Sequence, residues 1–389
     1  MDHRQRADFH GLWHLPVAAL AFAAAIAACA ATPDPAGLMR DISPMALAAD
    51  MGAGVNIGNT LDSIWDGPSP AMETGWGNPA ITRGFIAALR NHGYRTVRLP
   101  VTWAEHLGAA PDYVIEESWL ARVEEVASWC LDEGLYVVVN LHHDGGDSEE
   151  SWIKDAAADA DRITRKFTAV WAQIADRFRD APDYLVFEAM NEVGFDSLSL
   201  GDAQTLLARL NQAFVDTVRA SGGNNAVRWL LAAGYWTDID RTCDSRYRLP
   251  ADGQNRILLS VHYYTPSTFC IADAPNNSWG FRADWGTAAD YAELAAQFDK
   301  LNARFTSQGV PVVLGEYGVT KKNKDEASRV KWMTAVTQIC LDNGICPVLW
   351  DTGGEISRTA PYAMSNSLQT VMTAPRRIYF ENLYIEKNR

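Results

Sequence analysis

Two glutamates of this 389-residue chain, Glu192 and Glu316, each stand at the end of an apolar run. Glycoside hydrolysis requires such a pair, because one carboxylic acid protonates the leaving oxygen while a second carboxylate acts on the opposite side of the sugar ring. Asn191 can donate a hydrogen bond to a sugar hydroxyl. Arg98 and nearby histidines are expected to keep Glu316 ionised, while a partly buried Glu192 keeps its proton.

Polar residues also end most of the other apolar runs, where a loop alone would not require them. One run carries Arg98, and others end in Asn140-Leu-His-His-Asp144, Val261-His-Tyr-Tyr264 and Leu349-Trp-Asp351. A single carboxylate at a strand end is weak evidence for an active site, since loops are polar in any case. Polar residues at six strand ends indicate that these ends meet at one site.

The elements that would position these residues alternate regularly along the chain. Short, β-branched apolar runs predict strands at 52–58, 96–101, 136–143, 184–192, 227–236, 257–264, 310–318 and 346–354. Segments of helical period predict helices at 81–92, 117–133, 160–178, 203–220, 291–307 and 326–342. Eight strands separated by helices predict an α/β fold, a single (β/α)8 barrel with its active site at the carboxyl ends of the strands.

Two regions fit this barrel less well. The segment 237–256 holds no convincing helix, and the helix after the eighth strand, at 366–373, is weak. A doubly wound sheet is the alternative, but no glycine-rich phosphate loop follows the first strand.

The flanking motifs resemble family 5 of the glycoside hydrolases, the cellulase family, in its endoglucanase and xyloglucanase branch. The similarity runs from about residue 50 to about residue 355. It rests on the segments Asn56-Ile-Gly-Asn-Thr-Leu-Asp62, Thr74-Gly-Trp-Gly-Asn-Pro79, Val97-Arg-Leu-Pro-Val-Thr-Trp103, Met190-Asn-Glu192, Ser260-Val-His-Tyr-Tyr-Thr-Pro266 and Leu314-Gly-Glu-Tyr-Gly318. The strand-eight end, Trp-Asp-Thr-Gly-Gly, departs from the pattern, because relatives often have a second Trp or an Asn there.

This resemblance implies a retaining endo-β-1,4-glucanase that cleaves cellulose-type or mixed-linkage β-glucans without a cofactor. It implies that Glu192 is the acid/base and Glu316 the nucleophile. It also implies direct roles in substrate binding for Arg98, His142, Asn191, His262, Tyr264 and Trp350.

Three other functions remain open on sequence grounds. A xyloglucanase, xylanase or mannanase would use the same two glutamates. A metal-dependent hydrolase could use His142, His143 and Asp144, but adjacent residues of a strand face opposite sides, so we expect His142 at the mouth and His143 packed outward. A non-catalytic carbohydrate-binding barrel would not need both glutamates.

The first residues predict export. Arg4 and Arg6 precede an apolar run, 15–28, that is too short to span a bilayer and is typical of a signal peptide. Either small-residue cleavage or lipidation of Cys29 could follow. We therefore expect a signal peptide at 1–30, a linker at 31–44 and a catalytic domain at 45–380.

Composition limits the partners of the chain. The formal net charge of −14 argues against nucleic acid or an anionic membrane and is compatible with a neutral polysaccharide. We expect a monomer with no transmembrane segment and no metal. Among the cysteines, Cys243 and Cys270 fall in long loops and are the favoured disulfide pair, and Cys340 and Cys346 could also pair.

Overall fold

Eight parallel strands form a closed barrel in the order β1 to β8 in the computed structural model, which describes residues 39–65 and 71–374. The strands are β1 (Gly54–Asn56), β2 (Thr96–Leu99), β3 (Tyr136–Asn140), β4 (Leu185–Glu188), β5 (Leu230–Asp238), β6 (Ile257–Tyr263), β7 (Val312–Tyr317) and β8 (Cys346–Leu349). The predicted (β/α)8 fold is confirmed.

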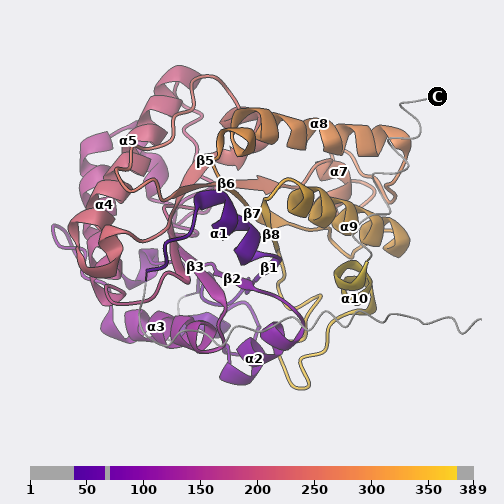
Figure 1. Ribbon diagram of the computed structural model, residues 1–389, viewed down its shortest axis with the longest axis horizontal. Helices are drawn as coiled ribbons and strands as arrows, with labels where there is room; N and C mark the ends of the chain where they lie inside the picture. Colours follow the sequence, from indigo (N-terminus) through magenta and orange to yellow (C-terminus); the bar gives the residue numbers. More distant parts are fainter. Residues whose placement is uncertain (1–38, 66–70, 375–389) are drawn as a thin grey trace, which may run out of the picture. The chain divides into compact units, whose positions relative to one another are not determined.

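Helices surround the barrel and connect its strands (Figure 1). The long helices are α2 (Arg83–Asn91), α3 (Glu117–Asp132), α4 (Ala160–Arg177), α5 (Leu200–Ala220), α8 (Ala288–Arg304) and α9 (Glu326–Asp342), and α10 (Asn366–Thr373) packs on α9. Of the two weak segments of the sequence, 237–256 holds the short helix α6 (Ile239–Thr242) after β5, and 366–373 forms α10. Another short helix, α7 (Ser267–Cys270), follows β6.

Local sequence explains where several helices begin. The side chain of Thr82 accepts a hydrogen bond from the first turn of α2, and Asp159 and Ser199 do the same for α4 and α5. At the start of α8, Thr287 and Asp290 form a reciprocal capping box. These caps fix the points at which the loops from the strands enter the helices.

A short helix that the sequence did not predict, α1 (Pro44–Met51), lies in front of the barrel in the view of Figure 1. Its Leu47 and Met51 belong to a fully buried cluster with side chains of six strands, among them Val138, Val186 and Leu231. The helix therefore closes the amino-terminal end of the barrel with apolar side chains and leaves the chemistry to the other end.

Except for β5, which continues to Asp238, the observed strands are shorter at their carboxyl ends than predicted. β3 ends at Asn140, so His142 and His143 lie in a loop, and β4 ends at Glu188, so Asn191 and Glu192 also follow their strand. The hydrogen bonds between strands stop where the backbone turns away to form the mouth of the barrel. An apolar run in the sequence does not indicate where that turn begins.

The favoured disulfide is wrong, because both Cys243 and Cys270 are free thiols, as are Cys130, Cys340 and Cys346. Cys243 follows α6 and lies near Arg304, whereas Cys270 ends α7 and lies near Lys324. The leader, Cys29 and most of the linker lie outside the described residues. No helix within 39–65 and 71–374 is long and apolar enough to cross a membrane.

Candidate active site

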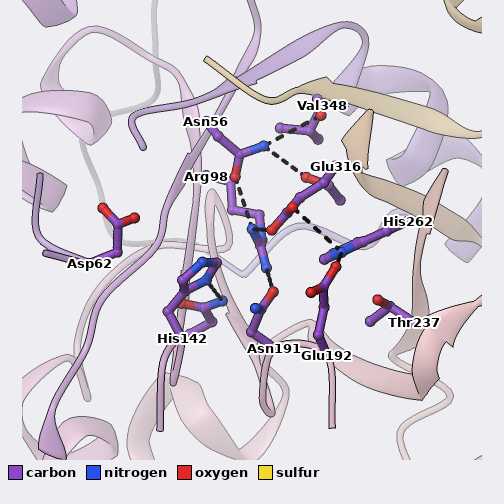
Figure 2. Close-up of polar contacts among 12 residues, drawn as sticks. Asn56, Asp62, Arg98, His142, Asn191, Glu192, Thr237, His262, Glu316 and Val348 are labelled. Atoms are coloured by element: carbon purple, nitrogen blue, oxygen red, sulfur yellow. Dashed lines mark hydrogen bonds and ion pairs between the residues drawn. The ribbon is translucent and has the colours of Figure 1, made fainter. Parts of the chain in front are cut away.

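Glu192 and Glu316 meet at the carboxyl end of the barrel (Figure 2). Glu316 lies on β7, and Glu192 lies in the loop that follows β4. One carboxylate oxygen of each residue and a ring nitrogen of His262 all lie within 4.8 Å of one another. Two carboxylates at this separation can act on opposite sides of one sugar ring, without room for an intervening water.

The guanidinium of Arg98 holds Glu316, and Asn191 beside Glu192, through hydrogen bonds. Its Nε donates to Glu188 at 2.6 Å, and its Nη1 donates to Asn56 and to Glu316, both at 2.9 Å. Its Nη2 donates to Oδ1 of Asn191 at 2.9 Å. Because Arg98 is fully buried and four hydrogen bonds go to protein side chains, it orients Glu316 and Asn191 instead of presenting itself to a substrate.

Glu188, the last residue of β4, is a buried partner of Arg98. Its second oxygen accepts a hydrogen bond from Ser260 on β6 at 2.6 Å. Both oxygens of this carboxylate are therefore occupied within the barrel, and Glu188 has a structural role in holding the guanidinium.

His262 connects the two carboxylates. Its Nδ1 lies 2.8 Å from Oε1 of Glu192 and 3.7 Å from Oε2 of Glu316. A register shift between β6 and β7 places His262 directly opposite Glu316. The extra residue in this shift is Gly315, where a Cβ would lie 3.0 Å from the His262 ring. Glycine therefore allows the imidazole to lie against the neighbouring strand.

The environments of the two carboxylates are unequal. The side chain of Glu316 is 7% exposed and that of Glu192 is 38% exposed. Burial, followed by the charge of Glu192, raises the pKa of Glu316, although His262, Arg98 and Tyr264 act in the opposite direction. Burial also raises the pKa of Glu192, but the hydrogen bond and charge of His262, together with the charges of Arg98 and His143, outweigh it, and the net pKa is lowered.

In the free protein these directions are opposite to those expected from the sequence, because the more buried carboxylate is Glu316. Neighbouring carboxylates titrate as a pair, so a proton taken up by the pair can be held by either one. The form with the proton on Glu192 and the charge on Glu316 is then one of two arrangements of that proton.

Tyr264 completes the contacts of Glu316. Its hydroxyl donates to Oε2 at 3.0 Å, while Arg98 donates to Oε1. Burial and the charges of both glutamates raise the pKa of Tyr264 well above its usual value, so the phenol stays a donor. Each oxygen of Glu316 thus has one fixed donor, which holds the carboxylate in a single orientation.

His142 and His143 differ from their predicted arrangement. They follow β3, so strand alternation does not separate them, and their rings lie 4.7 Å apart, edge to face. The His142 ring is parallel to Trp350 at 5.6 Å, and His143 packs against Trp76 at 5.4 Å. The expectation that His143 packs outward is therefore wrong.

One further cluster near the mouth has a geometry compatible with a metal ion. Asp62, His142 and His143 each offer a ligand atom within 4.8 Å of the other two. Burial raises the pKa of Asp62 to about 6, although the backbone N–H of Thr60 donates to it. Asp144, the carboxylate proposed from the sequence, instead accepts hydrogen bonds from Trp103 and Trp152 and is not part of the cluster.

Two hollows extend from the carboxylate pair and share Tyr264 and Ile271. One, of about 540 Å³, is lined by Trp350, Gly318 and Lys321 among others. The other, of about 320 Å³, includes Glu192 and residues of the β5–α6 segment. The site therefore lies within an elongated depression and not in a closed pocket.

Trp236 lines the hollow beside Glu192 and was missed by the sequence analysis, although it ends the predicted fifth strand. Its indole Nε1 donates to Asp196 at 2.9 Å. A Cβ on Gly194 would lie 1.8 Å from that nitrogen, so the indole can occupy this position only against glycine. Glu192 and Trp236 both have positive φ, 40° and 55°, and backbone strain of this kind is concentrated at functional sites.

Among the tryptophans in loops, Trp103 is fully buried and its indole donates to the backbone carbonyl of Asn140. It is therefore a core residue. Trp65, Trp76 and Trp279 are 51%, 41% and 50% exposed. On the helices, Trp171 and Trp332 are fully buried, whereas Trp129 is partly buried.

Comparisons with a family model and with known proteins indicate the same family. The family model for cellulase, glycosyl hydrolase family 5, matches residues 61–355. Endoglucanase B of Clostridium cellulovorans is 39% identical over 321 residues, which are 81% of this chain and 69% of that protein.

Two solved structures extend the comparison. A broad-specificity endoglucanase from Bacteroides salanitronis is 37% identical, with a TM-score of 0.77 over 86% of this chain and 94% of that one. A family 5 xyloglucanase from Paenibacillus pabuli is 33% identical, with a TM-score of 0.76 over 84% and 98% of the two chains.

The hydrogen bond from Tyr264 predicts a measurable change in the carboxylate. In a Glu192→Gln background, where Glu316 titrates without its partner, Tyr264→Phe should raise the pKa of Glu316 by about one to two units, since a hydrogen bond to a charged group is worth roughly 1.5–3 kcal/mol. Carbon-13 NMR titration of the glutamate carboxyl groups measures this shift. Tyr317→Phe is the control, because that hydroxyl bonds Thr337, and it should leave the pKa of Glu316 unchanged. An unchanged or lower pKa in Tyr264→Phe would contradict the assigned contact.

Proposed function

The chain belongs to the cellulase family, glycosyl hydrolase family 5, and we propose that in this glycoside hydrolase Glu316 is the nucleophile and Glu192 the acid/base. The enzyme is a retaining endo-β-1,4-glucanase that acts on internal bonds of β-glucans. The observation that carries the role assignment is the carboxylate pair bridged by His262, with its oxygens within 4.8 Å.

The chemistry follows from the fixed orientation of Glu316. An oxygen of Glu316 attacks the anomeric carbon while Glu192 gives its proton to the leaving oxygen, which forms a covalent glycosyl-enzyme and releases the first product. Glu192, now a carboxylate, removes a proton from water, and the water oxygen displaces Glu316 from the anomeric carbon. His262 contacts Glu192 in both steps, and Arg98 balances the charge that Glu316 carries before attack and after release.

The depression supports cleavage within a polymer. The two hollows on either side of Tyr264 allow sugar units to extend in both directions from the scissile bond. The hollow that contains Glu192 receives the leaving-group side, because the acid must reach the departing oxygen. Trp350 lines the opposite hollow, where its indole offers a flat apolar surface to a sugar ring.

Substrate-binding roles follow from which groups remain available at the cleft. Asn191 accepts from Arg98 through Oδ1, which leaves its amide N–H groups to donate to a sugar hydroxyl. Tyr264 and His262 line the hollow that contains Glu192, and His142 lies near Asn191 (Figure 2). Arg98 is fully buried and acts through Glu316 and Asn191 in place of the direct substrate contact expected from the sequence.

We also propose that the chain is exported through a leader at residues 1–30, joined by a linker to a catalytic domain at 45–380. Arg4, Arg6 and the apolar run 15–28 support this proposal. Mass spectrometry of the mature protein should show a terminus near Ala31, or a lipid-modified terminus at Cys29. A cytosolic protein that retains residues 15–28 would contradict export.

Substitution of the two glutamates separates their roles. Glu192→Ala should lower turnover of β-glucan by roughly 10²–10⁴-fold, the usual contribution of a general acid, but should slow the first step of activated aryl glycosides much less. Azide should rescue this variant and yield a β-glycosyl azide, because it replaces the water that Glu192 activates. Glu316→Ala should lose activity on all substrates, since no other group can form the intermediate.

Glu124→Ala is a matched control, because Glu124 pairs with Arg177 on the outer helices and should leave activity unchanged. Initial rates on β-glucan and on an aryl cellobioside measure these effects. Equal losses on both substrates in both glutamate variants, with no azide product, would contradict the assignment.

A further inference from the structure

Asn140, the last residue of β3, is a fully buried amide beside the site, and its orientation is fixed by the backbone. Its Oδ1 accepts a hydrogen bond from the backbone N–H of Val101 at 3.1 Å. Its Nδ2 lies 3.2 Å from Nδ1 of His142. Rotating the amide by 180° would turn its N–H groups toward the Val101 N–H, so the side chain has one acceptable orientation.

This orientation determines which nitrogen of His142 carries a proton. An amide nitrogen only donates, so Nδ1 of His142 must accept. A neutral imidazole has one protonated nitrogen, and the proton must then be on Nε2. The backbone N–H of His142 also donates to the carbonyl of Val101 at 2.8 Å, which ties the loop to the residue that orients Asn140.

The surroundings keep this ring neutral. Burial, and then the charges of His143 and Arg98, hold the pKa of His142 well below its usual value. The ring lies parallel to Trp350 at 5.6 Å, and Figure 2 places it beside Asn191 and the Arg98–Glu316 pair. Nε2 is the ring nitrogen that does not contact Asn140, so it is the one that remains to bond a ligand.

We propose that Asn140 is a positioning residue that holds His142 in the neutral Nε2–H tautomer, so that His142 donates a hydrogen bond to an oxygen of the sugar bound beside Glu316. The sugar contact rests on the proposed function, but the tautomer does not. With Nε2 protonated, His142 has no free lone pair for a proton or a metal ion. Within the Asp62–His142–His143 cluster, His142 is therefore a donor toward hydroxyl groups and not a metal ligand.

Nitrogen-15 NMR of histidine-labelled protein without substrate tests the tautomer directly. The signals of His142, identified by their loss in His142→Gln, should show an unprotonated Nδ1 and a protonated Nε2. In Asn140→Asp the carboxylate can only accept, so Nδ1 should become protonated, either as the other neutral tautomer or as imidazolium. Asn140→Ala, which removes the donor without adding charge, should populate the Nδ1–H tautomer.

Asn211→Asp is the matched control, because Asn211 is a fully buried amide that bonds only the backbone of Ala233 among the described residues. It should reduce stability and leave the His142 signals unchanged. In Asn140→Asp, kcat/KM on β-glucan should fall by about tenfold or more, since the sugar loses a donor and meets an unmatched nitrogen or an extra charge.

A protonated Nδ1 in the unsubstituted enzyme would overturn the proposal, as would unchanged His142 signals in both Asn140 variants. A matching fall in kcat/KM for Asn211→Asp would overturn the specific link to the sugar. If the enzyme shows the expected tautomer but does not cleave β-glucan, the proposed function fails and the positioning role stands.

Discussion

The buried guanidinium of Arg98 connects the parts of the barrel on which the site depends. Its hydrogen bonds reach Asn56 on β1, Glu188 on β4 and Glu316 on β7, as well as Asn191 in the loop after β4. A charge without exposure to water must be paired, and removal of one partner of a buried pair typically costs about 3–5 kcal/mol. The barrel therefore keeps Glu188 as a permanent counter-ion, so that Arg98 remains charged while Glu316 changes from carboxylate to ester and back.

The remaining geometry follows from this anchor. Glu316 has a single orientation because Arg98 and Tyr264 each occupy one of its oxygens. Glu192 is placed by a different route, through a loop with positive φ and through His262. The two carboxylates thus have separate supports, which lets one remain fixed for attack while the more exposed one exchanges protons with the leaving group and with water.

Much of the fold was predictable from the sequence because its signals are local. Helix α9 has the predicted bounds, and all eight strands lie within or close to their apolar runs. Glu192 and Glu316 could be identified because each follows such a run within a family motif. Helix α1 was missed because eight residues, five of them alanine or methionine, give too little pattern.

The features of the site that the sequence did not predict depend on contacts between residues that are distant along the chain. The arrangement of His142 and His143 depends on where β3 ends, and the pairing of His262 with Glu316 depends on a register shift between β6 and β7. Relative burial reversed the expected pKa order of the carboxylates, because Glu316 lies deeper than Glu192. The hydrogen bond from Asn140 to His142 likewise depends on the backbone N–H of Val101, which orients the Asn140 amide.

The central claim is that Glu316 attacks the sugar directly, and the configuration of the first product tests it. Carboxylates about 5–5.5 Å apart give retention, whereas about 6.5–9.5 Å is needed to admit the water of an inverting reaction. One oxygen of Glu192 lies within 4.8 Å of one oxygen of Glu316, which agrees with the shorter separation. Proton NMR during the first minutes of β-glucan hydrolysis should show the β-anomer first, followed by mutarotation, and an α-anomer appearing first would contradict the mechanism.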